Sequence, residues 1–379
     1  MELSGRPMSP SQFLEQVGGG DITEIARYFR QLADWGYLEV IEERLGRRRG
    51  ASIERIYKVV RGAHLDTSTW EGLPRFQRDV VSDSILGSYF NRVSEAVAAG
   101  TFDQEVDRHL SWDGVVLDQG AWKELGSELD DILHWLLTLE DEADNRLTEV
   151  GGERISTIVS LAAFRSPQPP DVIWDAPRRR AGGDNSTEKL ITIEMAKAMR
   201  NRWRSRILME LNARPLSPSM FVEEIGGSPS YVARCFRELA EWGYIRIVVE
   251  KPGGRHGGGV ERIYRNTQRA YFDTKTWSEL PPLLRSEFSN SVLGSYVARV
   301  AEAIKAGTFD AETDRHLSWI PLMLDRQAWI EVSVRLDEVL DRLPELQANS
   351  LNEHKGPIDT LIPTTVGLAS FRSPLPEEC

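Results

Sequence analysis

One short motif that could do chemistry occurs twice in the chain. Asp107-Arg108-His109 returns about 207 residues later as Asp314-Arg315-His316. A carboxylate, a guanidinium and an imidazole in sequence are typical of acid–base and metal sites. A metal site needs several convergent ligands, however, and the remaining histidines do not recur between the copies; they are His64, His134, His256 and His354. We therefore expect each motif to form a buried ion pair with a hydrogen-bonded histidine, and we expect no metal.

Other signatures of catalysis are missing from the sequence. There is no glycine-rich phosphate loop after a strand, no nucleophile elbow and no HExxH pair. The glycines at 18–20 and 257–259 fall in predicted turns, where glycine serves backbone geometry. Cys235 and Cys379 are the only cysteines, too few for a disulfide framework. We expect neither an enzyme nor a cofactor.

A second recurring set of residues is basic and lies on predicted helices. Segment 26–37 returns almost unchanged as 233–244, and each copy has an apolar stripe on one side of a helix that a glycine ends. The tryptophans at the helix ends, Trp35 and Trp242, are expected in the core. The outward positions are expected to be Thr23, Glu24, Arg27, Tyr28, Arg30 and Gln31 in the first copy, and Ser230, Tyr231, Arg234, Cys235, Arg237 and Glu238 in the second.

Each of these helices precedes two predicted strands joined by a basic loop. The strands span about 37–43 and 52–59 in the first copy, and 244–250 and 260–265 in the second. A cationic hairpin tip is suited to phosphate contact, because neutralising phosphates releases condensed counterions. The loop residues concerned are Arg47, Arg48 and Arg49 in the first copy, and Arg255 and His256 in the second.

The whole chain is a tandem duplication. Phe164-Arg165-Ser166-Pro167 closes the first copy as Phe371-Arg372-Ser373-Pro374 closes the second. Copy two opens with a predicted helix over about 188–212, whereas copy one starts where the corresponding helix is ending. Two explanations stay open: a first unit without its opening helix, which we favour, or a translation start placed too far downstream.

The order helix, tight turn, helix and basic hairpin is that of a winged helix-turn-helix. On these residues the chain resembles the ArsR-like winged-helix transcriptional regulators, over about 60–80 residues in each copy. The resemblance implies that the outward helix residues read base edges in the major groove of DNA while the hairpin tip holds phosphates. It also implies that the helix after the wing pairs the two copies within one chain.

The remaining residues form two predicted α+β modules and a linker. Each module starts with a long amphipathic helix from about 69 or 276, followed by strand, helix and strand, and resembles the C-terminal portion of actinobacterial-type regulators of this kind. The expected fold class is mainly α with small β (α+β), with two winged-helix domains each followed by such a module. The module elements are expected at 110–117, 119–143 and 157–164, and at 317–324, 326–343 and 365–371. The boundaries are 1–62 for winged helix 1 with its truncated opening helix, 63–167 for module 1, 168–187 for the linker, 188–270 for winged helix 2 and 271–379 for module 2.

Charge is distributed unevenly along the chain. Its 379 residues carry 46 Lys and Arg against 58 Asp and Glu, a formal net charge of −12. Residues 1–62 and 188–270 together are nevertheless positive by about 7 charges, so the acidity belongs to the modules. An acidic body repels DNA, so a duplex would approach the protein only at the two neutral-to-basic units. The sequence shows no secretion signal and no apolar run of about 18 residues, so we expect a cytoplasmic protein without a membrane partner.

These patterns predict a bacterial, sequence-specific transcriptional regulator that binds double-stranded DNA as a single-chain pseudo-dimer. Its non-identical recognition helices would read an asymmetric site, and further oligomerisation stays open. A small-molecule effector in the modules is a compatible hypothesis, with Trp112 and Trp319 as candidate pocket residues, although core packing is the simpler interpretation for them. The alternative is a protein-interaction module whose winged helices no longer bind DNA, which is consistent with the acidic total.

Overall fold

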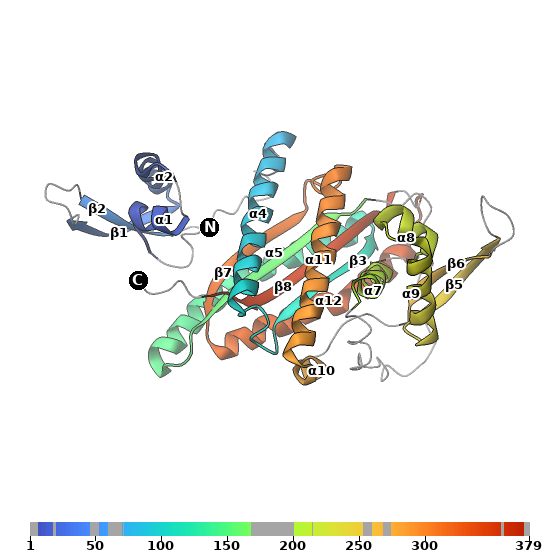
Figure 1. Cartoon of the computed structure of the whole chain (residues 1–379). Coiled ribbons are helices and arrows are strands. Elements are labelled where there is room, and N and C mark those ends of the chain that lie inside the picture. Colours follow the sequence, from blue (N-terminus) through green and yellow to red (C-terminus); the bar gives the residue numbers. More distant parts are fainter. Residues whose placement is uncertain are drawn as a thin grey trace.

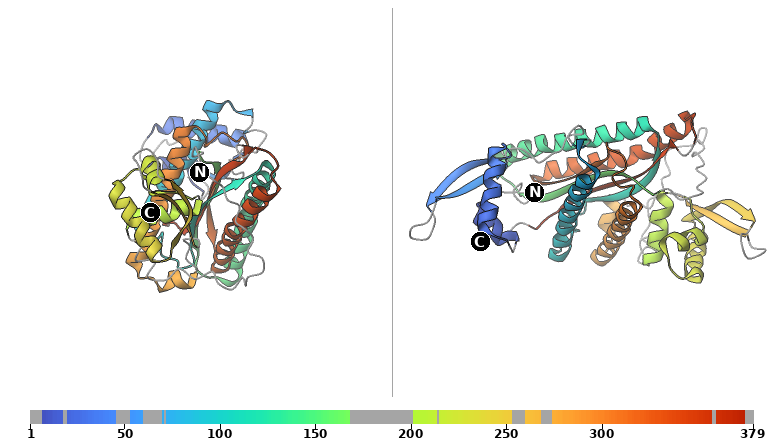
Figure 2. Two further views of the ribbon diagram at one scale, coloured as in Figure 1. Left: turned by 90° about the vertical axis from the view of Figure 1, so that its right-hand side faces the viewer. Right: turned by 90° about the horizontal axis from the view of Figure 1, so that it is seen from above.

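The computed structural model describes residues 7–17, 20–45, 53–59, 70, 72–167, 201–213, 215–252, 260–267, 274–357 and 360–374. The fold is mixed α/β, with two small helix–hairpin units at opposite ends of a layered body (Figures 1 and 2). None of the helices in these ranges is both long enough and apolar enough to span a bilayer.

The body consists of one sheet covered by helices on both faces. Its elements are α4 (Arg75–Ala99), β3 (His109–Leu117), α5 (Gln119–Val150) and β4 (Ile155–Arg165) from the first copy, and α11 (Pro282–Ala306), β7 (His316–Leu324), α12 (Arg326–Glu353) and β8 (Ile362–Arg372) from the second. Helices α4 and α11 lie on one face of the sheet, and α5 and α12 lie on the other (Figures 1 and 2). The expected order of strand, helix and strand is confirmed in both copies.

The predicted bounds of the body helices were wrong at three points. Helix α4 starts after Pro74 and α11 after Pro281, because proline fixes an extended residue before the first turn. The residues around 276 instead form a separate short helix, α10 (Thr274–Glu279). Helices α5 and α12 continue for more than a turn beyond the predicted ends, and α12 does so through Pro344.

The strands of the two copies alternate in the sheet. Their order is β3-β8-β4-β7, all antiparallel, so every hydrogen-bonded neighbour comes from the other copy. In the central β4–β8 pair, Leu161 lies opposite Leu368, its own counterpart in the repeat. A pseudo-two-fold axis therefore passes through this pair, and the two predicted modules share one sheet.

The two helix–hairpin units are built alike around the strand pair. The first consists of α1 (Pro10–Val17), α2 (Ile22–Asp34), β1 (Leu38–Leu45) and β2 (Ile53–Val59); the second consists of α7 (Arg202–Ala213), α8 (Pro218–Ile225), α9 (Pro229–Glu241), β5 (Ile245–Pro252) and β6 (Val260–Asn266). Met8 forms an antiparallel bridge with Tyr57, and Leu216 forms the same bridge with Tyr264. Each hairpin also has a register shift at the corresponding place, after Val40 and after Ile247.

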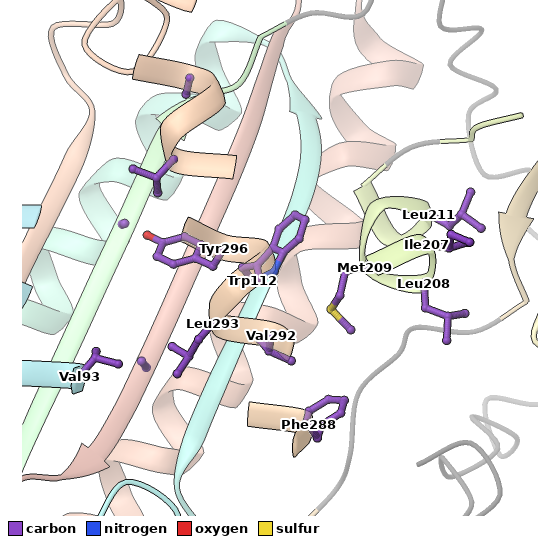
Figure 3. Close-up of a cluster of buried hydrophobic side chains, with 14 of the residues drawn as sticks. Val93, Trp112, Ile207, Leu208, Met209, Leu211, Phe288, Val292, Leu293 and Tyr296 are labelled. Atoms are coloured by element: carbon purple, nitrogen blue, oxygen red, sulfur yellow. The ribbon is translucent and has the colours of Figure 1, made fainter. Parts of the chain in front are cut away.

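The cores of the two units differ in extent. Met8, Phe29, Leu38 and Tyr57 form a small cluster that belongs to the first unit alone. The core of the second unit is continuous with that of the body, because the buried residues of α7 belong to the same cluster as those of α11 and β3. Figure 3 shows Met209 of α7 beside Trp112 of β3, with Leu208 and Leu211 directed away from the sheet.

Candidate nucleic-acid interface

The same face of α2 and of α9 stays exposed in both units. In α2 this face carries Thr23, Arg27 and Arg30, and in α9 the repeat-related residues are Ser230, Arg234 and Arg237. The side chains of Arg27 and Arg234 are 57% and 55% exposed. Phe29 and Phe236 lie on the opposite side of their helices, in the cores. The amphipathic pattern of the sequence thus produces one buried and one outward face per helix, as predicted.

The two central arginines are held only loosely. Arg27 lies over the ring of Tyr28 at 5.1 Å and near Glu24 at 3.4 Å. Arg234 lies over the ring of Tyr231 at 4.6 Å and near Glu238 at 3.7 Å. Exposed ion pairs of this length contribute little to stability, so either guanidinium is available to exchange its partner for a phosphate or a base edge.

Three residues of α9 that were expected to point outward do not do so. Cys235 is completely buried, because α7 covers this side of α9, and burial raises the pKa of its thiol. Tyr231 and Glu238 are half-buried. The Asn201 amide donates to the Tyr231 hydroxyl at 2.6 Å, and Arg204 of α7 donates to Glu238 at 3.0 Å. The covering helix lies far earlier in the sequence than the segment it covers, which is why periodicity within α9 could not reveal it.

The corresponding side of α2 is open. Tyr28, the counterpart of Cys235, is exposed, and so is Gln31, the counterpart of Glu238. The expectation that Trp35 and Trp242 are core residues was also wrong, because they are 66% and 46% exposed. Trp242 is the less exposed of the two because Arg204 of α7 lies over its ring at 4.8 Å. Tyr28 and Gln31 therefore occupy the side of α2 that α7 covers in the second unit.

The first turns of the two helices differ in charge. Helix α2 is capped by Asp21, whose carboxylate accepts from the Thr23 amide at 2.7 Å, and carries Glu24 in the same turn. Helix α9 has no acidic residue in its first turn, where the hydroxyls of Ser228 and Ser230 lie 3.2 Å apart. Because a helix N-terminus favours anions, α9 is the better of the two for phosphate contact.

The hairpins carry a similar difference. Strands β1 and β2 have a net charge of about −1, whereas β5 and β6 have about +2. In each hairpin an arginine bridges to a glutamate on the facing strand, Arg55 to Glu43 at 2.8 Å and Arg262 to Glu250 at 2.9 Å. The predicted tip residues Arg47, Arg48, Arg49, Arg255 and His256 lie outside the described residues.

A buried ion-pair network attaches the second unit to the body. Glu210 of α7 is fully buried between Arg206 at 2.7 Å and Arg299 of α11 at 3.8 Å. Arg206 also donates to the Ser295 carbonyl at 3.1 Å and pairs with Glu302 at 3.3 Å. Burial, together with the Glu210 carboxylate, raises the pKa of Glu302. Sequence reasoning missed this network, because its partners lie in different predicted domains.

The repeated Asp-Arg-His motif joins the two copies. His109 Nδ1 lies 2.8 Å from Asp337 of α12, and His316 Nδ1 lies 2.9 Å from Asp130 of α5. In each case Nε2 meets a serine two residues further along the strand, Ser111 or Ser318, at 2.7 Å. The expectation of a buried, hydrogen-bonded histidine is confirmed, and each partner carboxylate comes from the other copy.

The arginine and the aspartate of each motif also contact a tryptophan of the other copy. Arg108 is buried on Asp103 at 2.6 Å and stacks over Trp277 of the second copy at 4.5 Å; Arg315 is buried on Asp310 and stacks over Trp70 of the first at 4.6 Å. Desolvation lowers the pKa of both guanidinium groups. Trp122 donates to Asp314 at 2.6 Å, and Trp329 donates to Asp107 at 2.8 Å. Such exchange of equivalent contacts is the hallmark of an isologous interface.

The candidate pocket residues are part of the core, and a different place in the body is hollowed. Trp112 and Trp319 are buried in the central cluster. A cavity of about 530 Å³ lies between α5 and α12, lined by apolar side chains, three acidic groups and one arginine. Its lining residues are Asp131, Ile132, Trp135, Ile330, Glu331, Val334, Arg335 and Glu338. On the repeat-related side, Arg342 bridges to Glu124 and Glu128 instead.

Among the described residues there is no group of three or more His, Cys, Asp or Glu side chains arranged to hold a metal ion. No protein-family model matches the chain, and no curated protein or solved structure does so either.

Proposed function

We propose that the chain is a DNA-binding transcriptional regulator in which α2 and α9 are the recognition helices of two winged helix-turn-helix units. One observation carries the proposal. Arg27 and Arg30 recur as Arg234 and Arg237 on a helix face that stays exposed in both units, although five neighbouring positions of α2 are less buried than their counterparts in α9. A surface arginine without a binding role need not occur at the same position in both copies.

Arginine on the outward face of such a helix suits both kinds of DNA contact. Its planar fork of donors pairs with guanine O6 and N7 in the major groove, or with two phosphate oxygens. The exposed first turn of α9 adds backbone N–H groups and the hydroxyls of Ser228 and Ser230 for a phosphate. The hairpins follow these helices in sequence, so their basic tips would supply further phosphate contacts.

The body would present the two recognition helices to one duplex as a pseudo-dimer. The interleaved sheet and the reciprocal histidine pairs support this, because neither copy can leave the other without breaking them. Two helices on one face of DNA need a separation of about 34 Å or a multiple of it. Because Glu24 stands where Tyr231 stands in the partner unit, the two half-sites would differ in sequence.

The cavity between α5 and α12 is the place in the body that suits an effector. Trp135, Ile330 and Val334 offer apolar surface, and Asp131 and Glu331 offer negative charge, whereas Glu338 is paired with Arg335 at 2.7 Å. An apolar molecule with a positive charge would complement both.

The proposal is tested by selecting bound duplexes from a random library with the full chain and measuring affinity against salt. We expect the logarithm of the binding constant to fall linearly with the logarithm of salt concentration. Arg27→Ala and Arg234→Ala should each weaken binding by about 1–3 kcal/mol, or roughly 5- to 150-fold. The control is Lys123→Ala, which removes an exposed cation from α5 in the body and should leave the affinity for DNA unchanged.

Failure to enrich any duplex, or equal effects of the three variants, would contradict the proposal. That result would favour the alternative of a protein-interaction module, because the acidic residues in the first turn of α2 and in β1 suit protein contact better than phosphate contact.

A further inference from the structure

The cavity between α5 and α12 lies on one side of the pseudo-two-fold axis, and an arginine fills the place that the axis relates to it. There the Arg342 guanidinium of α12 donates to Glu128 of α5 at 2.6 Å, and to Glu124 one turn earlier. A single cation from one copy thus joins α12 to two carboxylates of the other copy.

The cavity has the surroundings of this arginine site without its cation. Three of its lining residues have counterparts there: Trp135 corresponds to Arg342, Glu331 to Glu124 and Arg335 to Glu128. Trp135 takes the place of the guanidinium and brings no charge. The repeat therefore shows both what an occupant of this place looks like and that the chain supplies one on only one side of the axis.

The charges at the cavity leave it negative. Arg335 and Glu338 pair with each other at 2.7 Å, so their charges cancel. Asp131 and Glu331 are the other two charged residues that line the cavity. Neither of them forms an ion pair in the part of the chain that the structure describes. Two carboxylates that face one hollow favour a cation in it.

Glu331 retains the capacity to accept further hydrogen bonds. One of its carboxylate oxygens accepts from the Gln327 amide at 2.9 Å, a contact that brings no charge. Arg146 interacts with Glu331 electrostatically, but its hydrogen bonds go to Asp325, the closer at 2.6 Å. A cation in the cavity would be able to donate to Glu331 without breaking either contact.

The wall of the cavity is apolar where the arginine site is polar. Ile330 and Val334 are 45% and 52% exposed, and their counterparts across the axis are Lys123 and Ser127. The volume of about 530 Å³ is in the usual range of small-molecule sites. A second copy placed on this surface by two-fold symmetry would bring its carboxylates against identical carboxylates, which disfavours a dimer here.

We propose that the cavity binds one small organic cation per chain, an amine or guanidine on an aromatic or alkyl body. The cationic group lies over the Trp135 ring and pairs with Glu331, as Arg342 pairs with Glu124 across the axis. The apolar body packs on Ile330 and Val334. The molecule joins α5 to α12 and hence one copy to the other. Its role as an effector rests on the proposed function, whereas its binding does not.

The probe is phenylpropylguanidine, titrated into the full chain by isothermal titration calorimetry. We expect one molecule to bind per chain with a Kd of about 0.1–1 mM. Phenylpropylurea has nearly the same shape without the charge and should bind at least about tenfold more weakly. No DNA is present in this titration, so its result is separate from that of the duplex selection.

Two variants place the probe in the cavity. Glu331→Gln should weaken binding about 5- to 10-fold, because it removes the charge that pairs with the guanidinium. Trp135→Arg should abolish binding, because it supplies a cation at the place that Arg342 occupies across the axis. Glu124→Gln is the matched control, since it removes the counterpart charge at the arginine site, and should leave binding unchanged.

Three results would overturn the proposal: no saturable binding up to about 10 mM phenylpropylguanidine, equal binding of phenylpropylurea, and binding that is indifferent to Glu331→Gln.

Two further results would replace the small cation by another occupant. Tighter binding after Arg178, Arg179 and Arg180 are changed to alanine would show that this basic run of the chain, which lies outside the described residues, takes the cavity itself. A mass that rises with protein concentration in ultracentrifugation, and that phenylpropylguanidine returns to one chain, would show that a second copy does.

Discussion

The first and second helix–hairpin units have the same local structure and different attachments. Their strand bridges, hairpin register shifts and buried phenylalanines correspond one to one. The second unit nevertheless shares its core with the body through α7, whereas the first has a small core of its own. The comparison shows that the residues which form such a unit are distinct from those which fix its position.

The attachment also changes which residues α2 and α9, the proposed recognition helices, expose. In the second unit α7 covers Cys235 and restrains Tyr231 and Glu238, leaving Arg234 and Arg237 outward. In the first unit Tyr28 and Gln31 are exposed as well. The arginines, together with Thr23 and Ser230, are thus outward positions common to both units, and the differences at Tyr28 and Gln31 follow from α7.

The largest effect should come from breaking the buried attachment. Arg299→Ala leaves Glu210 buried without its partner on α11 and should lower the free energy of unfolding by about 3–5 kcal/mol. Arg92→Ala, at the equivalent place in the first copy, should cost less, because the Arg92 side chain is 20% exposed against 5% for Arg299 and its partner Glu95 is exposed. Urea denaturation measures both. Similar losses in the two variants would show that α7 does not distinguish the units.

If the Arg299→Ala variant stays folded, the reactivity of Cys235 gives a second measurement of whether α7 is attached. Cys235 lies beneath α7, and its burial keeps the thiol neutral and slow to react. We expect faster alkylation of Cys235 in Arg299→Ala than in Arg92→Ala. An unchanged rate would mean that α7 remains docked without the arginine.

An intermediate effect should come from exchanging residues across the axis of the sheet. A Cβ at Gly367 would meet the Tyr296 ring at 2.5–2.7 Å, whereas the equivalent Ser160 forms a hydrogen bond with Tyr89. Gly367→Ser should therefore destabilise the chain by about 1–3 kcal/mol, as overpacking does. Ser160→Gly should cost within about 1 kcal/mol. Thermal unfolding of the two variants tests whether the halves pack differently at this point.

The smallest effect concerns the first turn of α2. If the proposed function holds, Glu24 repels phosphate there, and Glu24→Gln should raise affinity for DNA by about 0.3–1 kcal/mol, or roughly two- to fivefold. Glu345→Gln on α12 removes the same charge from the far layer of the body and should have no effect. Fluorescence anisotropy at low salt measures both, and equal gains would show that only total charge matters.

The repeat predicted the order of the elements because each copy carries the same local patterns. Periodicity placed β3, α5 and β4, and the buried faces of α2 and α9 around Phe29 and Phe236, since these depend on neighbours in sequence. The histidine pairs were predicted as buried contacts, but their partners Asp337 and Asp130 could not be named. They depend on strand exchange between copies, which leaves no mark in local periodicity.

The errors concern contacts between elements. Cys235 was expected outside but lies beneath α7, whereas Trp35 and Trp242 were expected inside and are exposed both without and with a contact from α7. The interleaved strand order likewise joins residues more than 150 positions apart, as Ser160 and Trp319 are. Contacts of this range are decided by the packing of whole elements, which single-sequence patterns do not encode.

Footprinting of the full chain on its selected duplex tests the central claim most directly, that two different units read one site. We predict a non-palindromic site in which Arg27→Ala alters protection and base preference in one half and Arg234→Ala alters them in the other. A perfect palindrome whose halves respond equally to both variants would contradict it.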